Sequence, residues 1–387
     1  MKPIYKIMLI AGEASGDAHA AKLVNALRRQ SPETDFQFFG ATGADMRDAG
    51  VETILKADDL AIVGLAEIAR ALPMFFKTFQ ILKTVAIERK PDAVILIDFP
   101  DFNLKLAKAL KKHGLKIIYY ISPQLWAWRR YRAKTIKNSV DLLLTILPFE
   151  RDWYAKRGIT HVSYVGNPLA GEVKSKLSKE EFCAKHNLFL AKPIISLLAG
   201  SRHKEVTRIL PPLLETAGLM NRRDTDLQFV VPLAPTRRIE EIEDAKIKAR
   251  VLPTNLTVVK DETREALNAS DAAAVTSGTA TLETAIIGVP MAIVYKTSAL
   301  NYGLLRPIIS VEHFGLINLI AQKRLAKEFI QNEFTPEKLA DEMFRLLDPE
   351  TNKKARAGLL EVVETLGKGG ASKRAAEAVL ELLNNKI

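Results

Sequence analysis

The sequence predicts an α/β fold with two doubly wound domains that face a cleft, each built on a parallel sheet. The predicted strands are nearly continuous apolar runs, which is typical of parallel strands covered on both faces. Strands alternate with helical segments, and the pattern restarts after a polar stretch, residues 166–179, that contains Pro168 and Gly171. A chain of 387 residues is also longer than one hydrophobic core usually organises.

The first half begins with an apolar strand at residues 5–11, a turn over "GEASGD" and a helix at residues 18–29. Further apolar runs, several rich in β-branched and aromatic residues, predict the remaining strands of this half. They lie in the stretches 35–40, 91–97, 115–122, 140–150 and 161–168.

The second half repeats this organisation. Its apolar runs predict strands within residues 192–202, 226–235, 255–261, 270–283 and 289–296. The tail contains two amphipathic patterns, residues 356–367 and 372–385, which predict helices separated by "KGGA".

Composition limits the class of protein. Hydrophobic residues make up 48% of the chain and charged residues 26%, as in a globular protein. The longest stretch without Asp, Glu, Lys or Arg is 14 residues, too short and too polar to span a membrane, and no signal peptide is recognisable. The net charge of +11 favours an acidic partner, which nucleic acid, an anionic membrane or a phosphorylated substrate would equally satisfy.

Two strand ends in the first half carry candidate chemistry. The first strand ends in Gly12-Glu13-Ala14-Ser15-Gly16-Asp17, where glycines either admit a ligand to the backbone or only close a turn. The strand at residues 93–97 ends in Asp98, which no local structural role explains. A partly desolvated carboxylate there has the raised basicity of a general base, whereas an ion pair with a lysine is the alternative. Asp101 is interpreted as the N-cap of the following helix.

Two further segments combine apolar and basic residues. In "SPQLWAWRRYRAK", Ser122 and Pro123 fit the start of a helix. Trp126 and Trp128 either belong to the core, stack on nucleic-acid bases or lie at a membrane interface. Residues 60–87 carry more large apolar side chains than one core face needs, among basic residues, which indicates either a membrane-surface segment or a core helix. Those apolar residues include Leu72, Met74, Phe75, Phe76 and Phe79.

The second half has two strand–turn–helix patterns suited to an anion. In the first, the apolar run that begins at Ile194 leads into Gly200-Ser201-Arg202 and a helical spacing that starts at Val206. Such a turn offers unpaired backbone N–H groups and the positive end of a helix dipole. In "VTSGTATLE", Ser277, Gly278 and Thr279 do the same, and Glu283 is placed in the first helical turn.

A metal site is not expected. Asp224-Thr225-Asp226 forms a D-x-D, but it precedes its strand and so lies at the wrong end of the sheet. Cys183 is the only cysteine, and the six histidines show no zinc spacing.

Taken together, these segments resemble the lipid-A-disaccharide synthase family of bacterial glycosyltransferases. The matching stretches occur in the family's order and cover nearly the whole chain. They are "AGEASGD", "DFPDFN", "YYISPQLWAWR", "LPFE", "GSR", "SGTATLE" and "INLIA".

The resemblance implies a GT-B architecture, with two Rossmann-like domains and a C-terminal helix that packs back on the first. Residues 1–166 would be the acceptor and lipid-binding domain, with membrane contact through the segment 60–87. Residues 167–350 would bind the UDP-sugar, and residues 351–387 would form the C-terminal helices.

The resemblance also implies the reaction. UDP-2,3-diacylglucosamine and 2,3-diacylglucosamine 1-phosphate would be joined into a β-1,6-linked disaccharide 1-phosphate, with inversion, release of UDP, and no cofactor or metal. The enzyme would be cytoplasmic, peripheral on the inner face of the bacterial inner membrane, with an anionic lipid surface and no nucleic acid as partner. Self-association stays open.

The resemblance assigns a role to each candidate residue. Asp98 would be the base and Arg202 would stabilise the departing UDP. The donor would be held by Gly200, Ser201, Arg202, Ser277, Gly278, Thr279, Glu283 and Asn318, and the acceptor by Glu13, Ser15 and Gly16. Two alternatives are a UDP-N-acetylglucosamine 2-epimerase-like enzyme of the same architecture and a non-catalytic lipid- or nucleotide-binding module.

Overall fold

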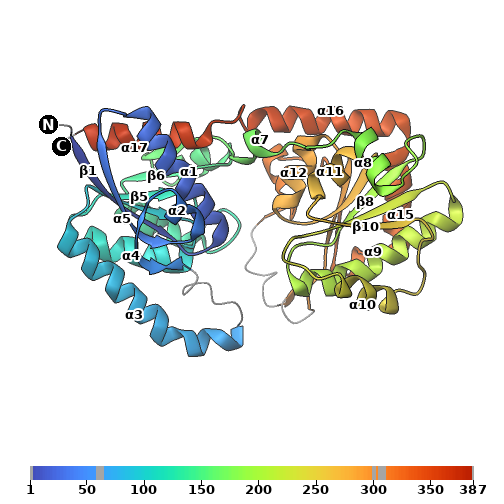
Figure 1. Ribbon diagram of the computed structural model, residues 1–387, viewed down its shortest axis with the longest axis horizontal. Coiled ribbons are helices and arrows are strands. Elements are labelled where there is room, and N and C mark those ends of the chain that lie inside the picture. The colour runs from blue at the N-terminus through green and yellow to red at the C-terminus, as the bar shows by residue number, and fades with distance from the viewer. Residues whose placement is uncertain (1–2, 58–64, 299–301, 304–310, 386–387) are drawn as a thin grey trace. The chain divides into compact units, whose positions relative to one another are not determined.

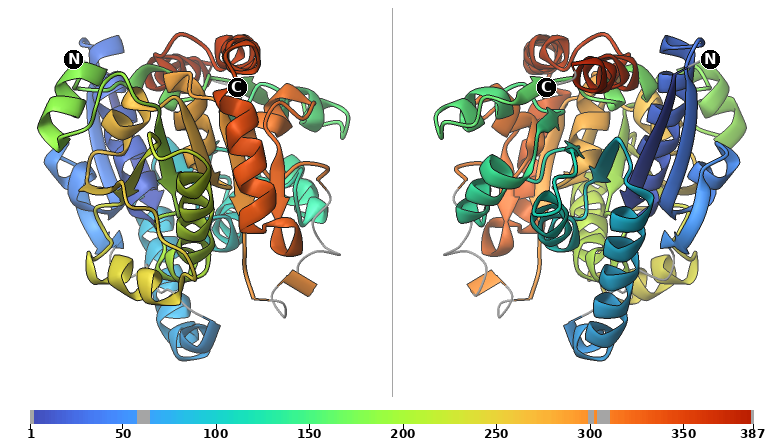
Figure 2. Two further views of the ribbon diagram at one scale, coloured as in Figure 1. Left: turned by 90° about the vertical axis from the view of Figure 1, so that its right-hand side faces the viewer. Right: turned by 90° about the vertical axis from the view of Figure 1, so that its left-hand side faces the viewer.

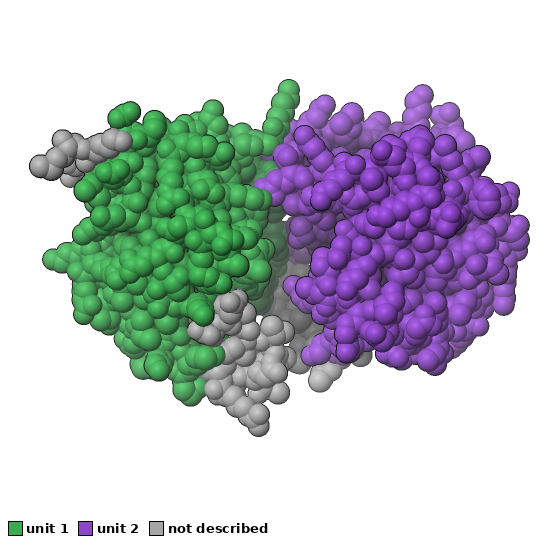
Figure 3. Space-filling view, viewed as in Figure 1, with its two compact units in different colours: residues 1–168, 368–387 green, residues 169–367 purple. Residues whose placement is uncertain are grey.

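The computed structural model describes residues 3–57, 65–298, 302–303 and 311–385, with only the backbone given for residues 65–72. The chain forms two compact units, residues 1–168 with 368–387 and residues 169–367 (Figure 3). Each unit is a parallel sheet flanked by helices, as Figures 1 and 2 show. The predicted α/β class is confirmed.

The first unit contains a seven-stranded sheet in the order β3-β2-β1-β4-β5-β6-β7. Its strands are β1 (Ile4–Ala11), β2 (Asp35–Thr42), β3 (Glu52–Lys56), β4 (Ala93–Ile97), β5 (Ile117–Tyr120), β6 (Leu142–Thr145) and β7 (Val162–Tyr164). Its helices are α1 (Ala14–Gln30), α2 (Ala44–Asp48), α3 (Leu65–Arg89), α4 (Pro100–Lys111), η2 (Arg130–Arg132), α5 (Ala133–Ser139), α6 (Glu150–Ala155) and α17 (Ala371–Asn384).

The second unit contains a six-stranded sheet in the order β10-β9-β8-β11-β12-β13. Its strands are β8 (Ile194–Leu198), β9 (Gln228–Leu233), β10 (Leu256–Lys260), β11 (Ala272–Thr276), β12 (Met291–Tyr295) and β13 (Glu328–Ile330). Its helices are α7 (Leu169–Glu172), α8 (Lys179–His186), α9 (His203–Arg223), α10 (Glu240–Lys248), α11 (Thr263–Ala269), α12 (Thr279–Ile287), α14 (Leu316–Ala321), η3 (Gln331–Glu333), α15 (Pro336–Leu347) and α16 (Pro349–Thr365).

Both sheets reverse their winding at one internal position. In the first unit the chain leaves β1 toward β2 on one side and returns as β4 on the other, so that Ala11 pairs with Ile97. In the second unit the same happens at β8 and β11, where Leu198 pairs with Val275. Ligands of doubly wound sheets bind beyond the carboxyl ends of the strands at such reversal points.

The C-terminal helix closes the first unit. Ala375, Ala376 and Val379 of α17 are buried against α1, in the core on the face of the first sheet that α1 covers. The Arg374 Nε donates a hydrogen bond to the Val165 carbonyl at 2.8 Å, which fixes the helix to the end of β7. The predicted return of the C-terminal helix to the first domain is confirmed, whereas α16, the helix before it, packs in the second unit.

Two local predictions are wrong. The turn predicted over "GEASGD" is shorter than expected, because α1 already begins at Ala14. No helix begins at Ser122-Pro123, since helical structure resumes only at Arg130. There the Ser122 hydroxyl lies 2.9 Å from the Tyr154 hydroxyl, and the Trp126 indole N–H donates to the buried Glu150 carboxylate at 3.1 Å. These contacts favour an irregular loop over a helix.

Candidate active site

The reversal point of the second sheet carries a pocket of about 390 Å³. It is formed mainly by the turn after β8 and the turn after β11, with further residues from the loop after β9. The residues predicted to hold a donor that line it are Gly200, Ser201, Arg202, Ser277, Gly278, Thr279 and Glu283. The fold therefore brings together two segments about 75 residues apart in sequence, as expected where neighbouring parallel strands end side by side.

The first turn of the pocket leads directly into α9. Gly200 has a φ of +101°, a backbone conformation that glycine adopts most easily, and α9 begins at His203. The N–H groups at the start of a helix have no partner within the helix, and the dipole adds partial positive charge. The Arg202 side chain is 82% exposed and its Nη1 donates to the Glu205 carboxylate at 2.9 Å. The turn therefore gathers several donors suited to an anion, and the Glu205 carboxylate engages three of them.

The second turn is fixed by hydroxyl hydrogen bonds. Thr276 Oγ1 donates to the Leu198 carbonyl at 2.8 Å, which joins the ends of β11 and β8. Ser277 Oγ donates to the Phe314 carbonyl at 2.7 Å. Gly278 is the N-cap of α12 with a φ of +145°, and no atom beyond its own chain neighbours lies within 4 Å of where its Cβ would be. The start of α12 therefore stays accessible to a ligand.

Glu283 lines this pocket, whereas Asn318, which was also predicted to hold the donor, does not. Glu283 lines the pocket and accepts a hydrogen bond from Arg264 Nη2 at 3.0 Å. It lies in the second turn of α12 rather than the predicted first turn. Asn318 is fully buried in α14, where its amide donates to Glu328 and to the Ala326 carbonyl. Glu328 in turn accepts from the Phe314 and Gly315 N–H groups, so Asn318 supports the loop that Ser277 contacts.

The reversal point of the first sheet carries Asp98, in the turn between β4 and α4. Asp98 and Phe99 have φ values of +47° and +50°, a left-handed conformation that is unfavourable for residues other than glycine. Pro100 follows and disfavours a right-handed helical conformation at Phe99. The Asp98 carbonyl accepts from Asn103 Nδ2 at 2.8 Å and from Tyr119 Oη at 2.6 Å. The surrounding structure thus holds this strained turn in place.

The Asp98 carboxyl is an unusually weak acid for an aspartate. Burial raises its pKa to about 6, the nearby Glu13 carboxylate adds to the shift, and the Phe99 backbone N–H opposes it. A carboxylate with this pKa is mostly ionised at neutral pH and is a better proton acceptor than an ordinary aspartate. These are the properties of a general base.

The residues predicted to hold an acceptor lie at the start of α1, beside Asp98. Glu13 is the N-cap residue of α1 and, like Ser15, is exposed, whereas Gly16 is buried against the end of β4. A Cβ at Gly12 would lie 2.4 Å from the Phe99 ring, so this glycine permits the close approach of the two turns. The arrangement leaves two exposed polar side chains next to the Asp98 turn.

Two other acids near this turn have structural partners. Asp17 is buried and its carboxylate accepts from the backbone N–H groups of Gly43, Asp45 and Met46. Asp101 pairs with Arg129 and Arg132, and the N-cap of α4 is Phe99, so the interpretation of Asp101 as a helix cap is wrong. Neither acid is placed as a free base.

The apolar and basic segment 60–87 divides into core and surface residues. Phe75 packs on the rings of Phe99 and Phe102, and Phe79 packs edge-on against Phe102. Met74 is 37% exposed and Phe76 66% exposed. The side chain of Leu72 lies outside the described residues. Of the predicted membrane-contact residues whose side chains the structure describes, Met74 and Phe76 are therefore the exposed ones.

Trp126 and Trp128 also differ in their surroundings. Trp126 is buried and bonded to Glu150, whose pKa burial raises to about 7 although the Leu147 N–H and the Trp126 indole N–H oppose the shift. Trp128 is half-buried, and the Arg129 guanidinium lies 4.3 Å from its ring centroid. The first tryptophan therefore belongs to the core of the unit.

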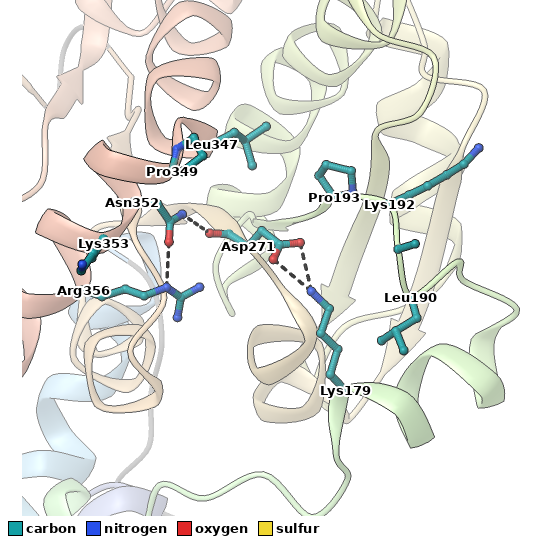
Figure 4. Close-up of a pocket in the computed structure, with 11 residues that line it drawn as sticks. Lys179, Leu190, Lys192, Pro193, Asp271, Leu347, Pro349, Asn352, Lys353 and Arg356 are labelled. Atoms are coloured by element: carbon teal, nitrogen blue, oxygen red, sulfur yellow. Dashed lines mark hydrogen bonds and ion pairs between the residues drawn. The ribbon is translucent and has the colours of Figure 1, made fainter.

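A second pocket, of about 460 Å³, lies at the opposite ends of the strands of the second sheet (Figure 4). Pro193 and Asp271, which line it, directly precede β8 and β11, so it lies at the amino ends of the strands. Lys179 pairs with Asp271, and Arg356 donates to Asn352 and to the Gly288 carbonyl. Asn352 Nδ2 also donates to the Asp271 carbonyl at 2.9 Å. These contacts tie α8 and α16 to the start of β11 and to the end of α12, which is a structural role.

The D-x-D residues lie near these same strand ends. Asp226 pairs with Lys192, and Asp224 is the C-cap residue that follows α9. Among the residues that the structure describes, no group of three or more His, Cys, Asp and Glu residues could hold a metal ion. Within the same residues, no helix is long and apolar enough to cross a membrane.

Three functional contacts were not predicted from the sequence. Tyr119 and Asn103 hold the Asp98 carbonyl, and Glu205 binds the Gly200–Arg202 turn. The position of Glu205, three residues after Arg202, is the spacing of a capping box and could have been recognised. Tyr119 and Asn103 carry no comparable signal, because their partner is a backbone atom.

The chain matches one protein family over almost its full length. The sequence profile described as Lipid-A-disaccharide synthetase matches residues 7–382. The lipid-A-disaccharide synthase of Geobacter metallireducens is 42% identical, with 99% of each chain covered. That of Trichlorobacter lovleyi is 43% identical, with 98% of this chain and 97% of the relative covered.

Solved structures with a similar fold have much lower sequence identity. A putative UDP-N-acetylglucosamine 2-epimerase from Listeria monocytogenes has a TM-score of 0.64 at 16% identity, covering 99% of this chain and 98% of that one. MurG from Acinetobacter baumannii has a TM-score of 0.55 at 15% identity, covering 98% and 99%. At this identity the likeness shows a shared fold alone.

Proposed function

The chain belongs to the lipid-A-disaccharide synthetase family, and from this premise we propose how its two sites divide the reaction. The enzyme is a glycosyltransferase that joins UDP-2,3-diacylglucosamine to 2,3-diacylglucosamine 1-phosphate. The second unit holds the UDP-sugar, and the first holds the acceptor and the base. The observation that supports this division most is the pocket at the β8 and β11 turns, which combines two helix starts with Arg202.

The donor diphosphate binds across the two turns of that pocket. Backbone N–H groups at the starts of α9 and α12 bind its oxygens, together with the Thr279 hydroxyl. Arg202 pairs with the β-phosphate, where negative charge grows as UDP departs. Glu283 accepts hydrogen bonds from ribose hydroxyls, and Asn318 acts indirectly through Glu328 by fixing the loop against Ser277.

The acceptor is activated by Asp98. Its carboxylate takes the proton of the acceptor 6-hydroxyl while that oxygen attacks the anomeric carbon of the donor. The bond from the anomeric carbon to the β-phosphate oxygen breaks, UDP leaves, and the configuration at that carbon inverts to give the β-1,6 linkage. Glu13, Ser15 and Gly16 position the acceptor beside this carboxylate.

The acceptor and the donor both carry acyl chains, which are held in a lipid layer. We propose that Met74 and Phe76 of α3 enter the surface of an anionic membrane on the cytoplasmic side. The net charge of +11 favours that surface electrostatically. Burial of exposed apolar side chains adds a contribution that salt does not screen.

Incubation of the purified protein with both acylated substrates tests the proposed reaction. We expect UDP and disaccharide 1-phosphate in equal amounts, and neither product when the acceptor is omitted. A parallel incubation with UDP-N-acetylglucosamine alone tests the epimerase alternative. Epimer formation there, or UDP release without disaccharide, would overturn the proposed function.

A further inference from the structure

Glu205 occupies the backbone groups to which the donor diphosphate is assigned. Its Oε2 atom accepts hydrogen bonds from the Ser201 and Arg202 backbone N–H groups, each at 3.3 Å. Its Oε1 atom accepts from Arg202 Nη1 at 2.9 Å. One carboxylate thus engages two amides and the guanidinium of the Gly200–Arg202 turn.

The turn is shaped to admit this carboxylate. A Cβ at position 200 would lie 2.5 Å from Glu205 Oε2 and 3.0 Å from the Glu205 Cβ, so any side chain larger than that of glycine would push Glu205 out. The Glu205 side chain is 19% exposed, whereas that of Arg202 is 82% exposed. The carboxylate sits inside the turn, and the guanidinium extends from it.

Carboxylates and phosphates compete for the same donors, because both are oxyanions that bind helix-terminal N–H groups and guanidinium groups. We propose that Glu205 is an internal competitor of the donor diphosphate, which holds the turn in the free enzyme and is displaced on binding. This inference rests on the proposed assignment of the diphosphate to the Gly200–Arg202 turn. It makes Glu205 a positioning residue that adjusts affinity.

A displaced Glu205 has an alternative partner nearby. Arg208 lies three residues further along α9, on the same face, and forms no ion pair with the part of the chain that the structure describes. Burial raises the pKa of Tyr295, the Glu205 charge adds to this, and the charges of Arg202 and Arg208 oppose it. All three charges therefore act on one phenol.

Titration of UDP into wild type, Glu205→Gln and Glu215→Gln by calorimetry tests this inference. Glutamine keeps the size of the side chain but accepts a weaker, uncharged hydrogen bond, since charge-assisted bonds are about twice as strong. We expect UDP to bind about tenfold more tightly to Glu205→Gln, which should also melt at a lower temperature without ligand. Glu215 lies on the same helix and accepts from the Arg250 N–H, so Glu215→Gln controls for the lost charge.

The outcomes separate the inference from the function on which it rests. If wild type does not bind UDP, the assignment of the diphosphate fails, and this inference fails with it. If wild type binds UDP and Glu205→Gln binds it equally or more weakly, Glu205 is a fixed helix cap and the inference alone is overturned.

A structure of wild type with UDP gives an answer that does not depend on a variant. We expect Glu205 Oε2 to have left both the Ser201 and the Arg202 N–H groups, with UDP oxygens in its place. Retention of both hydrogen bonds beside bound UDP would overturn the inference.

Discussion

Asp98 combines a strained backbone with a carboxyl group of raised pKa. Positive φ values at non-glycine residues cost about 1–3 kcal/mol each, and here they occur at both Asp98 and Phe99. Tyr119 and Asn103 hold the turn through its carbonyl oxygen, which leaves the carboxyl group free of their hydrogen bonds. The strained turn therefore lowers the local stability while it fixes the position of the Asp98 carboxylate.

Asp98→Asn should reduce turnover by roughly 10²–10⁴-fold, because it keeps the size of the side chain and removes its basicity. The kcat/KM of wild type should fall as the pH is lowered through about 6, where Asp98 becomes protonated. Glu150, whose pKa is raised to about 7, becomes protonated over a similar range of pH. A pH profile of both proteins separates the two acids, since only the limb due to Asp98 should be absent from Asp98→Asn.

Asp101→Asn serves as the control. Asp101 pairs with Arg129 and Arg132 at an exposed position. Loss of these ion pairs in Asp101→Asn should lower the stability by at most about 1 kcal/mol and leave turnover nearly unchanged. A turnover of Asp98→Asn within a fewfold of wild type would show that Asp98 is structural.

The same carboxyl should lower the stability of the protein at neutral pH. Its pKa is about 6 in the folded state and near 3.8 when unfolded, so the folded state binds more protons between these values and stability falls as the pH rises. Above pH 6 the full penalty, at most about 3 kcal/mol, is present. Thermal melts should show Asp98→Asn more stable than wild type at pH 7.5, with the difference shrinking at pH 4. An equal difference at both pH values would contradict a raised pKa.

Single residues could be proposed from the sequence where the pattern is local. Asp98 was singled out because it follows a buried strand with no capping role, and its role as the base stays a prediction. Asp101 was misread because its partners, Arg129 and Arg132, lie about 30 residues away and leave no local pattern. The Glu205 contact has a local spacing, but the meaning of that spacing depends on the pocket around it.

The helix α3 connects a proposed membrane contact to the Asp98 turn. Its Phe75 ring stacks on Phe99, the residue after Asp98, at a centroid distance of 6.0 Å. Phe76, one position on, is 66% exposed. Because neighbouring helix positions point about 100° apart, one short stretch contributes both to the core and to the surface.

Replacing Met74 and Phe76 together with Ser should weaken binding to vesicles that contain anionic lipid by tenfold or more. Each exposed apolar side chain that enters a lipid layer contributes on the order of 1.5–3 kcal/mol. Co-sedimentation measures the binding, and the variant should keep its melting temperature, since neither residue is buried. Binding of wild type should weaken as salt rises.

The matched control is Phe189→Ser with Leu190→Ser, which removes two exposed apolar residues from the second unit. We expect this pair to leave vesicle binding unchanged. Equal loss in both variants, or no loss in the α3 variant, would remove α3 as the contact.

Elements were predictable where their apolar pattern was long. The central strands of both sheets lie where the sequence places them, because buried parallel strands are apolar throughout. The short edge strands β3 and β13 were missed, since edge strands of three to five residues with polar positions carry little pattern. The loop after β5 was predicted to start a helix, because the hydrogen bond from Trp126 to Glu150 that shapes it joins residues 24 positions apart in the sequence.

At the scale of the whole molecule, the order of the strands explains where the two proposed sites lie. In each sheet the two central strands end in turns that diverge, after β1 and β4 in one unit and after β8 and β11 in the other. The restart of the apolar pattern indicated the two domains, whereas the return of the chain to the first unit, from residue 368, was expected only from the family resemblance. That return depends on an apolar face of α17 that matches α1 and β6, which no single segment reveals.

The division of the reaction between two sites is tested most directly by UDP titration of Asp98→Asn and Arg202→Ala, with turnover measured on the same samples. Both variants should lose most turnover. Arg202→Ala should lose most of its UDP affinity and Arg202→Lys should regain only part, since a point charge cannot reproduce a two-pronged grip, whereas Asp98→Asn should bind UDP as wild type does. Wild-type UDP affinity in Arg202→Ala, or lost UDP affinity in Asp98→Asn, would contradict the division.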